Sequence, residues 1–181
     1  MADVHPRPRQ IAIRGIAVGV AALLVLVVAV ALRGCSRPPD RYVHAGSLAT
    51  LREGHVRTVE LRSFFDRELN EHRTIPVFVV RNGVNVLALL GRSTHLGCRV
   101  EDIARPRGEG SFAFVKHAEA RFADPCGGSA WDLNGTCLEG PCPRGLDRLS
   151  TSVDQRGRIV IDRESLQRGP PRTTTTPAPI P

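Results

Sequence analysis

The sequence lacks the features that mark a nucleic-acid-binding protein. Its net charge is +7, but residues 1–41 contain six arginines and two aspartates and so account for +4 of it. The following 140 residues have nineteen basic and sixteen acidic side chains. They contain no dense basic run and no basic segment interleaved with aromatic residues. We therefore exclude nucleic acid as a partner.

Motifs of several catalytic classes are also missing. The chain contains no G-x-S-x-G, no P-loop and no H-E-x-x-H. Ser129, in "GGSAWD", has no base beside it in the sequence, which favours a tight turn over a nucleophile. No helical pattern is long enough to connect parallel strands, and no internal repeat occurs, so the sheet is expected to be antiparallel.

One long apolar run is present near the start of the chain. Residues 15–32, "GIAVGVAALLVLVVAVAL", contain no charge. As a helix this run is about 27 Å long, close to the roughly 30 Å of a bilayer core. We expect a retained transmembrane helix over residues 15–33, after a cytoplasmic tail at 1–14 and before an extended tether at 34–41.

Two other interpretations of this run stay open. Ala29 and Ala31 form the A-x-A pattern of signal-peptide cleavage, and "LRGC", which ends at Cys35, faintly resembles a lipoprotein cleavage box. Arginines flank both ends of the run equally, so they do not set its orientation. Four of the five cysteines follow the run, and disulfides persist outside the cytoplasm. We therefore expect a single-pass protein of the cell membrane with its domain on the extracytoplasmic side.

Short strands are predicted after the tether, in a domain at residues 42–166. Two apolar runs flank Asn82-Gly83, a dipeptide that favours a type I′ hairpin turn. A Pro/Thr-rich tail at 167–181 is expected to be disordered. The other predicted elements are strands at 55–63, 75–80, 84–90 and 156–163, two short strands within 111–122, and a helical turn or insertion loop at 63–73.

Two hexapeptides, "STHLGC" at 93–98 and "DPCGGS" at 124–129, each carry one cysteine. With the hairpin "RNGVNVLALL" and the segment "GPCPRGLD", they resemble the Rieske iron-sulfur family, whose motifs are C-T-H-L-G-C and C-P-C-H-G-S. The resemblance covers nearly all of residues 42–162. It implies a mainly β, antiparallel domain with two disulfide-linked loops. In that family two cysteines and two histidines hold a [2Fe-2S] cluster.

The resemblance transfers only part of the family's site to this chain. The four ligand positions are Ser93, His95, Asp124 and Gly127, so one ligand in four is kept. The resemblance also implies a disulfide between Cys98 and Cys126. Gly128 and Ser129 match the family motif, whereas Trp131 stands where Tyr or Phe is usual.

Loss of the ligands changes the expected cofactor. We expect none, with an unusually ligated [2Fe-2S] cluster as the alternative. His95 and Asp124 are weak candidates for a mononuclear metal, because two donors fall short of the usual three or four. Each is better explained structurally: His95 as a loop residue bonded to backbone, and Asp124 as an Asx side chain that accepts from turn amides.

The remaining cysteines have separate roles. Cys137 and Cys142 flank a Gly-Pro turn at a spacing that suits a second disulfide. A thiol-disulfide activity at this pair is the last-ranked alternative, since Arg144 is the nearest basic residue. Cys35 is left over, to be lipidated, paired between chains or free.

The resemblance also implies a role. The family serves quinol-oxidising cytochrome bc complexes and related respiratory or photosynthetic assemblies. We expect a structural or accessory subunit of such an electron-transfer complex, not an enzyme by itself and at most an electron-transfer subunit of an oxidoreductase. An active [2Fe-2S] carrier with non-standard ligands stays the alternative.

Overall fold

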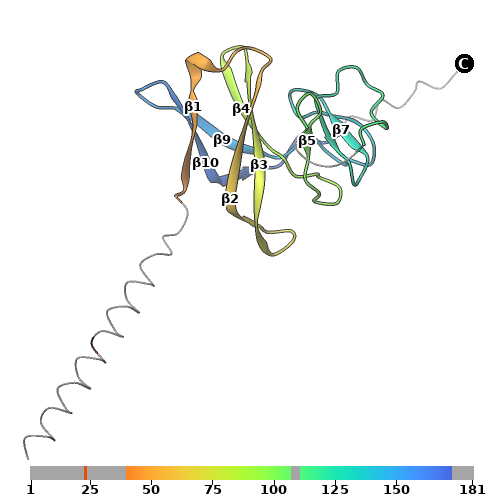
Figure 1. The fold of residues 1–181 in the computed structure, drawn as a ribbon, viewed down its shortest axis with the longest axis horizontal. Coiled ribbons are helices and arrows are strands. Elements are labelled where there is room, and N and C mark those ends of the chain that lie inside the picture. The colour runs from red at the N-terminus through yellow and green to blue at the C-terminus, as the bar shows by residue number, and fades with distance from the viewer. Residues whose placement is uncertain (1–22, 24–39, 107–110, 173–181) are drawn as a thin grey trace, which may run out of the picture. The chain divides into compact units, whose positions relative to one another are not determined.

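The computed structural model describes residues 23, 40–106 and 111–172. Within them the named strands form two antiparallel sheets, one of six strands in the order β1-β10-β9-β4-β3-β2 and one of four in the order β5-β6-β7-β8 (Figure 1). The elements are β1 (Tyr42–Ser47), the 3-10 helix η1 (Leu48–Thr50), β2 (Val56–Asp66), β3 (Glu71–Asn82), β4 (Asn85–Leu90), β5 (Glu101–Asp102), β6 (Phe122–Asp124), β7 (Ser129–Trp131), β8 (Cys137–Glu139), β9 (Arg148–Val153) and β10 (Arg158–Gln167).

The predicted transmembrane helix at 15–33 lies outside the described residues, except for Leu23. In the part of the chain that the structure describes, no helix has the length and apolar character needed to cross a membrane.

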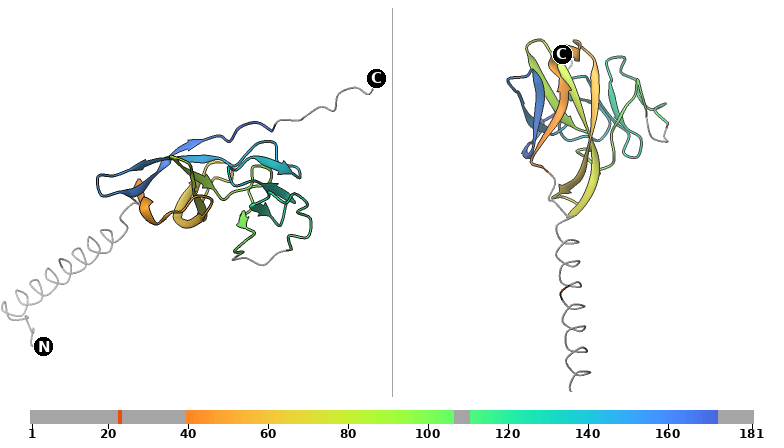
Figure 2. Two further views of the ribbon diagram at one scale, coloured as in Figure 1. Left: turned by 90° about the horizontal axis from the view of Figure 1, so that it is seen from above. Right: turned by 60° about the vertical axis from the view of Figure 1, so that its left-hand side comes forward.

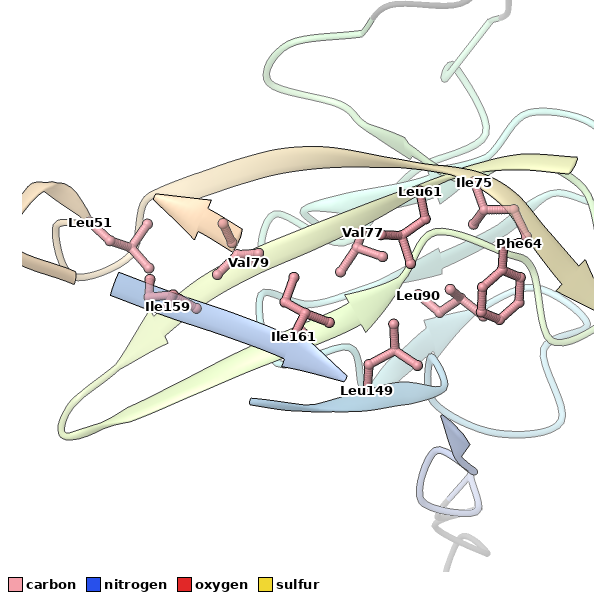
Figure 3. Close-up of a cluster of buried hydrophobic side chains, with 12 residues drawn as sticks. Leu51, Leu61, Phe64, Ile75, Val77, Val79, Leu90, Leu149, Ile159 and Ile161 are labelled. Atoms are coloured by element: carbon pink, nitrogen blue, oxygen red, sulfur yellow. The ribbon is translucent and has the colours of Figure 1, made fainter. Parts of the chain in front are cut away.

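Residues 75–80 of strand β3 are buried on both faces, which explains the continuous apolar run "IPVFVV". Successive side chains of a strand point to opposite faces of the sheet. Val77 and Val79 join one core, with residues of β2, β9 and β10, and Figure 3 shows these side chains converging from facing strands. Phe78 and Val80 join a second core. The large sheet therefore supports a separate hydrophobic layer on each side.

The second core joins the small sheet to the large one. Phe78 stacks on Phe122, with ring centroids 4.5 Å apart, and Trp131 is fully buried in the same cluster. Figure 2 shows the small sheet beside one end of the large sheet. Because the small sheet consists of strands of two or three residues, its stability depends on this shared core.

Several local predictions were wrong or shifted. Residues 63–73 form neither a helical turn nor an insertion loop: β2 and β3 continue through them as a long hairpin. Within 111–122 only Phe122 lies in a strand. The hairpin at residues 82–85 is present, but Asn82 pairs with Asn85, so Gly83 and Val84 form its turn.

The tail is ordered further than its composition predicts. Gln167 still belongs to β10, and the Gly169 amide donates to Asp147 Oδ1 at 2.9 Å. Pro170 O accepts from the Gly145 amide at 2.8 Å. The segment to Arg172 is thus part of the domain, and residues 173–181 lie outside the described chain.

Gly140 gives a test of the small sheet. Its φ of +84° is left-handed, and a Cβ there would collide with Gly128 O and lie 2.6 Å from Ser129 Cα. Gly157 has a φ of +70° but open space around it. We expect Gly140→Ala to lower the free energy of unfolding by about 3 kcal/mol and Gly157→Ala by about 1 kcal/mol. Chemical denaturation measures both, and equal losses would contradict the close approach of Gly140 to β7.

Candidate functional site

Two loops carry the predicted site. Loop one, residues 91–100, connects β4 to β5, and loop two, residues 125–128, is the turn between β6 and β7. A disulfide between Cys98 and Cys126 joins them, with a Cα–Cα distance of 6.5 Å. The structure therefore brings the two hexapeptides together through a covalent bond between their cysteines.

Loop one is closed by its own backbone. The Ser93 amide donates to Cys98 O at 2.8 Å, and Ser93 O accepts from the Gly97 amide at 3.0 Å. The Ser93 side chain is 1% exposed, and its Oγ accepts from the His95 amide at 3.3 Å. This hydroxyl thus stabilises the turn of loop one by accepting a backbone hydrogen bond. His95 itself is exposed, and its ring makes no hydrogen bond with the described residues, so the expected bond to backbone is absent.

Loop two is organised by Asp124, which is fully buried. Its Oδ1 accepts from the amides of Cys126 at 3.0 Å and Gly127 at 2.9 Å, the expected Asx arrangement. Its Oδ2 has no hydrogen-bond partner in the described structure. One oxygen of the carboxylate therefore holds the turn, and the other remains available at the site.

The backbone at Gly127 faces this free oxygen. A Cβ at residue 127 would collide with Asp124 Oδ2 and lie 3.5 Å from His95 Nδ1. The carboxylate and the imidazole thus flank the position where the family's second histidine would begin. Ser129 is opposite Asp124 in the register of β6 and β7, and its buried Oγ also lacks a partner among the described residues.

Sequence reasoning missed an ion-pair cluster around Arg92, at the start of loop one. The Arg92 side chain is 4% exposed and contacts Asp66 at 3.4 Å, Glu68 at 2.7 Å and Asp147 at 3.6 Å. The hydrogen bond from Arg92 lowers the pKa of Glu68. Arg144 adds a two-point contact with Asp147. No local signal reveals this cluster, because its members come from distant parts of the chain.

The segment after β8 supports the site from the other side. Thr94 Oγ1 donates to Arg144 O at 2.9 Å, and Trp131 Nε1 donates to the same carbonyl at 3.4 Å. Cys137 and Cys142 form the second disulfide. They are 8% and 1% exposed, and burial of this kind disfavours thiol-disulfide exchange.

No family model matches the chain. Over 78 residues, 43% of the chain, it is 38% identical to the ubiquinol-cytochrome c reductase iron-sulfur subunit of Rhodobacter capsulatus. This match agrees with the two loop motifs, which the structure places on paired loops. The chain carries a Rieske-type domain. The match spans 35% of the length of that relative, so it does not extend to the relative as a whole.

Two solved structures are similar to this chain at a low level. The ferredoxin of carbazole 1,9a-dioxygenase from Nocardioides aromaticivorans has a TM-score of 0.40 and 21% identity, over 67% of this chain and 97% of its own. A chain of a hyperthermophilic respiratory Complex III has a TM-score of 0.40 and 19% identity, over 80% and 98%.

The residues of this Rieske-type domain do not fit a [2Fe-2S] cluster. Such a cluster takes two thiolates on one iron and two imidazoles on the other. The corresponding positions offer a hydroxyl at Ser93, an imidazole at His95, a carboxylate at Asp124 and no side chain at Gly127. The nearest sulfurs, of Cys98 and Cys126, are bonded to each other. The donor set therefore lacks both thiolates and one imidazole.

The first disulfide should be a principal source of stability for the Rieske-type domain. It closes a sequence separation of 28 residues, which contributes about 3–4 kcal/mol through loss of chain entropy in the unfolded state. We expect the double variant Cys98→Ser, Cys126→Ser to lose this amount in urea denaturation. Cys35→Ser, which keeps both disulfides, is the matched control and should unfold as the wild type does. An unchanged double variant would show that other contacts hold the loops.

Proposed function

We propose that this chain is a membrane-anchored, extracytoplasmic Rieske-fold subunit of an electron-transfer complex, and that it works by docking without a cluster of its own. One observation carries the proposal. Asp124, at a cluster-ligand position, is buried, and one of its carboxylate oxygens accepts hydrogen bonds from two amides of loop two. A residue with this structural task stabilises the loop in the absence of a cluster.

The family relationship supports the kind of partner. The relative from Rhodobacter capsulatus is an iron-sulfur subunit of ubiquinol-cytochrome c reductase. In this proposal the chain keeps the docking surface of such a subunit together with its scaffold. We therefore assign this chain to a respiratory or photosynthetic complex of the cytochrome bc type. The uncharged run at 15–32 supplies the anchor in this proposal.

The tip of loop one is the proposed contact surface. Leu96 is 57% exposed there, next to the exposed His95. Leu69, on the turn of the long hairpin, is 44% exposed, and its Cδ1 would lie 3.5 Å from a Cβ at Gly97. An exposed leucine pair on a rigid, disulfide-tied loop is suited to burial against another subunit.

Co-purification tests the proposal. Tagged full-length chain, extracted from its own membranes with mild detergent, should carry stoichiometric b-type haem absorbance. Leu96→Asp should reduce this recovery at least tenfold, because a charge then enters the buried contact. Val84→Asp is the control, since Val84 is 96% exposed on a different turn and its change should have no effect. Extraction without detergent, or elution free of haem, would refute the assignment.

Restoring the ligands gives a second test. The wild type should contain no iron after maturation with iron and sulfide, whereas the triple variant Ser93→Cys, Asp124→Cys, Gly127→His should gain a Rieske-type electron paramagnetic resonance signal. Gly127→His alone should destabilise loop two, because its side chain collides with Asp124. Stoichiometric iron and that signal in the wild type would instead support the electron-carrier alternative.

A further inference from the structure

The vestigial site contains more metal donors than its ligand positions suggest. The Sγ atoms of Cys98 and Cys126 and a carboxylate oxygen of Asp124 all lie within 4.8 Å of one another. In the Rieske motif these two cysteines form the disulfide and are not ligands. Here they stand beside a carboxylate, which makes a different donor set from that of the cluster.

Two observations indicate that the free oxygen of Asp124 faces a space next to Gly127. Asp124 is fully buried, and its Oδ2 has no partner among the described residues. This is an unfavourable state for an anionic oxygen unless a cation or water faces it. His95 Nδ1 and Asp124 Oδ2 flank the same point above Gly127. His95 lies outside the group of three donors, and in the proposed site its exposed ring turns inward to supply a fourth donor at the mouth.

We propose that reduction of the Cys98–Cys126 disulfide converts this place into a mononuclear site for a divalent cation of the zinc type. Its ligands are the thiolates of Cys98 and Cys126, the free oxygen of Asp124 and the imidazole of His95. This set of two sulfurs, one oxygen and one nitrogen meets the four-coordinate preference of zinc.

The chemistry balances with a dithiol as the reductant. The dithiol passes two electrons to the disulfide and becomes a disulfide itself, while its two protons complete the thiols of Cys98 and Cys126. Binding of the cation then releases these two protons and leaves two thiolates on the metal. The bond is accessible to such a reductant, because Cys126 is exposed and Cys98 is half-buried.

The backbone geometry suits both states. The Cα atoms of the two cysteines are 6.5 Å apart, toward the wide end of the range for a disulfide. Two thiolates on one zinc ion stand about 3.8 Å apart, given bonds of about 2.3 Å at a tetrahedral angle. This Cα separation is compatible with both sulfur spacings. The metal would hold the loops together when the disulfide does not.

Cobalt provides the test, because tetrahedral Co²⁺ with thiolate ligands has intense visible bands and near-ultraviolet charge-transfer bands. Full-length protein carrying Cys35→Ser is titrated with Co²⁺, oxidised and after reduction. We expect both sets of bands at one equivalent only after reduction, and their loss on addition of excess Zn²⁺. Absence of the bands after reduction would overturn the proposal.

Variants assign the ligands. Asp124→Asn keeps the oxygen that accepts from the loop amides and replaces the free one, so we expect Co²⁺ affinity to fall at least tenfold, and likewise for His95→Ala. The variant Cys137→Ser, Cys142→Ser should retain the bands; their loss would place the thiolates at the other disulfide. Unchanged affinity in Asp124→Asn would refute the donor set. None of these outcomes depends on the proposed docking role, which co-purification tests separately.

Discussion

The bond between Cys98 and Cys126 is the constraint on which the two-loop site depends. Neither loop is long enough to form a core, and loop two consists of four residues between strands of three. In a cluster-binding relative, a metal centre and a disulfide share the task of holding such loops. Here the disulfide is helped by the Asp124 carboxylate, which satisfies the loop amides from inside the protein. In the proposed cluster-less role, one covalent bond and two hydrogen bonds hold the loops.

The large sheet positions this tie by being apolar on both faces. Alternate residues of β3 enter opposite cores, so the strand carries the main hydrophobic layer and also the platform for the small sheet. The stack of Phe78 on Phe122 and the burial of Trp131 then anchor β6 and β7 in the second core. This packing positions the loops, while the ion pairs of Arg92 hold the start of loop one.

The sequence allowed prediction of those features that depend on neighbours in the chain. Alternation and the Asn82-Gly83 pair predicted the central hairpin, and the Asx role of Asp124 followed from its place before Pro125-Cys126. The disulfide between the loops came from the family motif. The ion-pair cluster of Arg92 could not be predicted from the sequence, because residues 66, 92 and 147 come together only in the folded chain. The failure at 111–122 has a related cause: strand propensity acts only where a partner strand is available.

The collision between a residue-127 side chain and Asp124 couples these two positions of loop two. Any side chain at position 127 meets the carboxylate, since its Cβ would collide with Asp124 Oδ2. Replacing Asp124 first removes the oxygen to which two loop amides donate. A change at either position alone therefore disturbs loop two, whereas a paired change avoids the collision. Asp124 and Gly127 thus constrain each other, so that the side chain at one position cannot be chosen independently of the other.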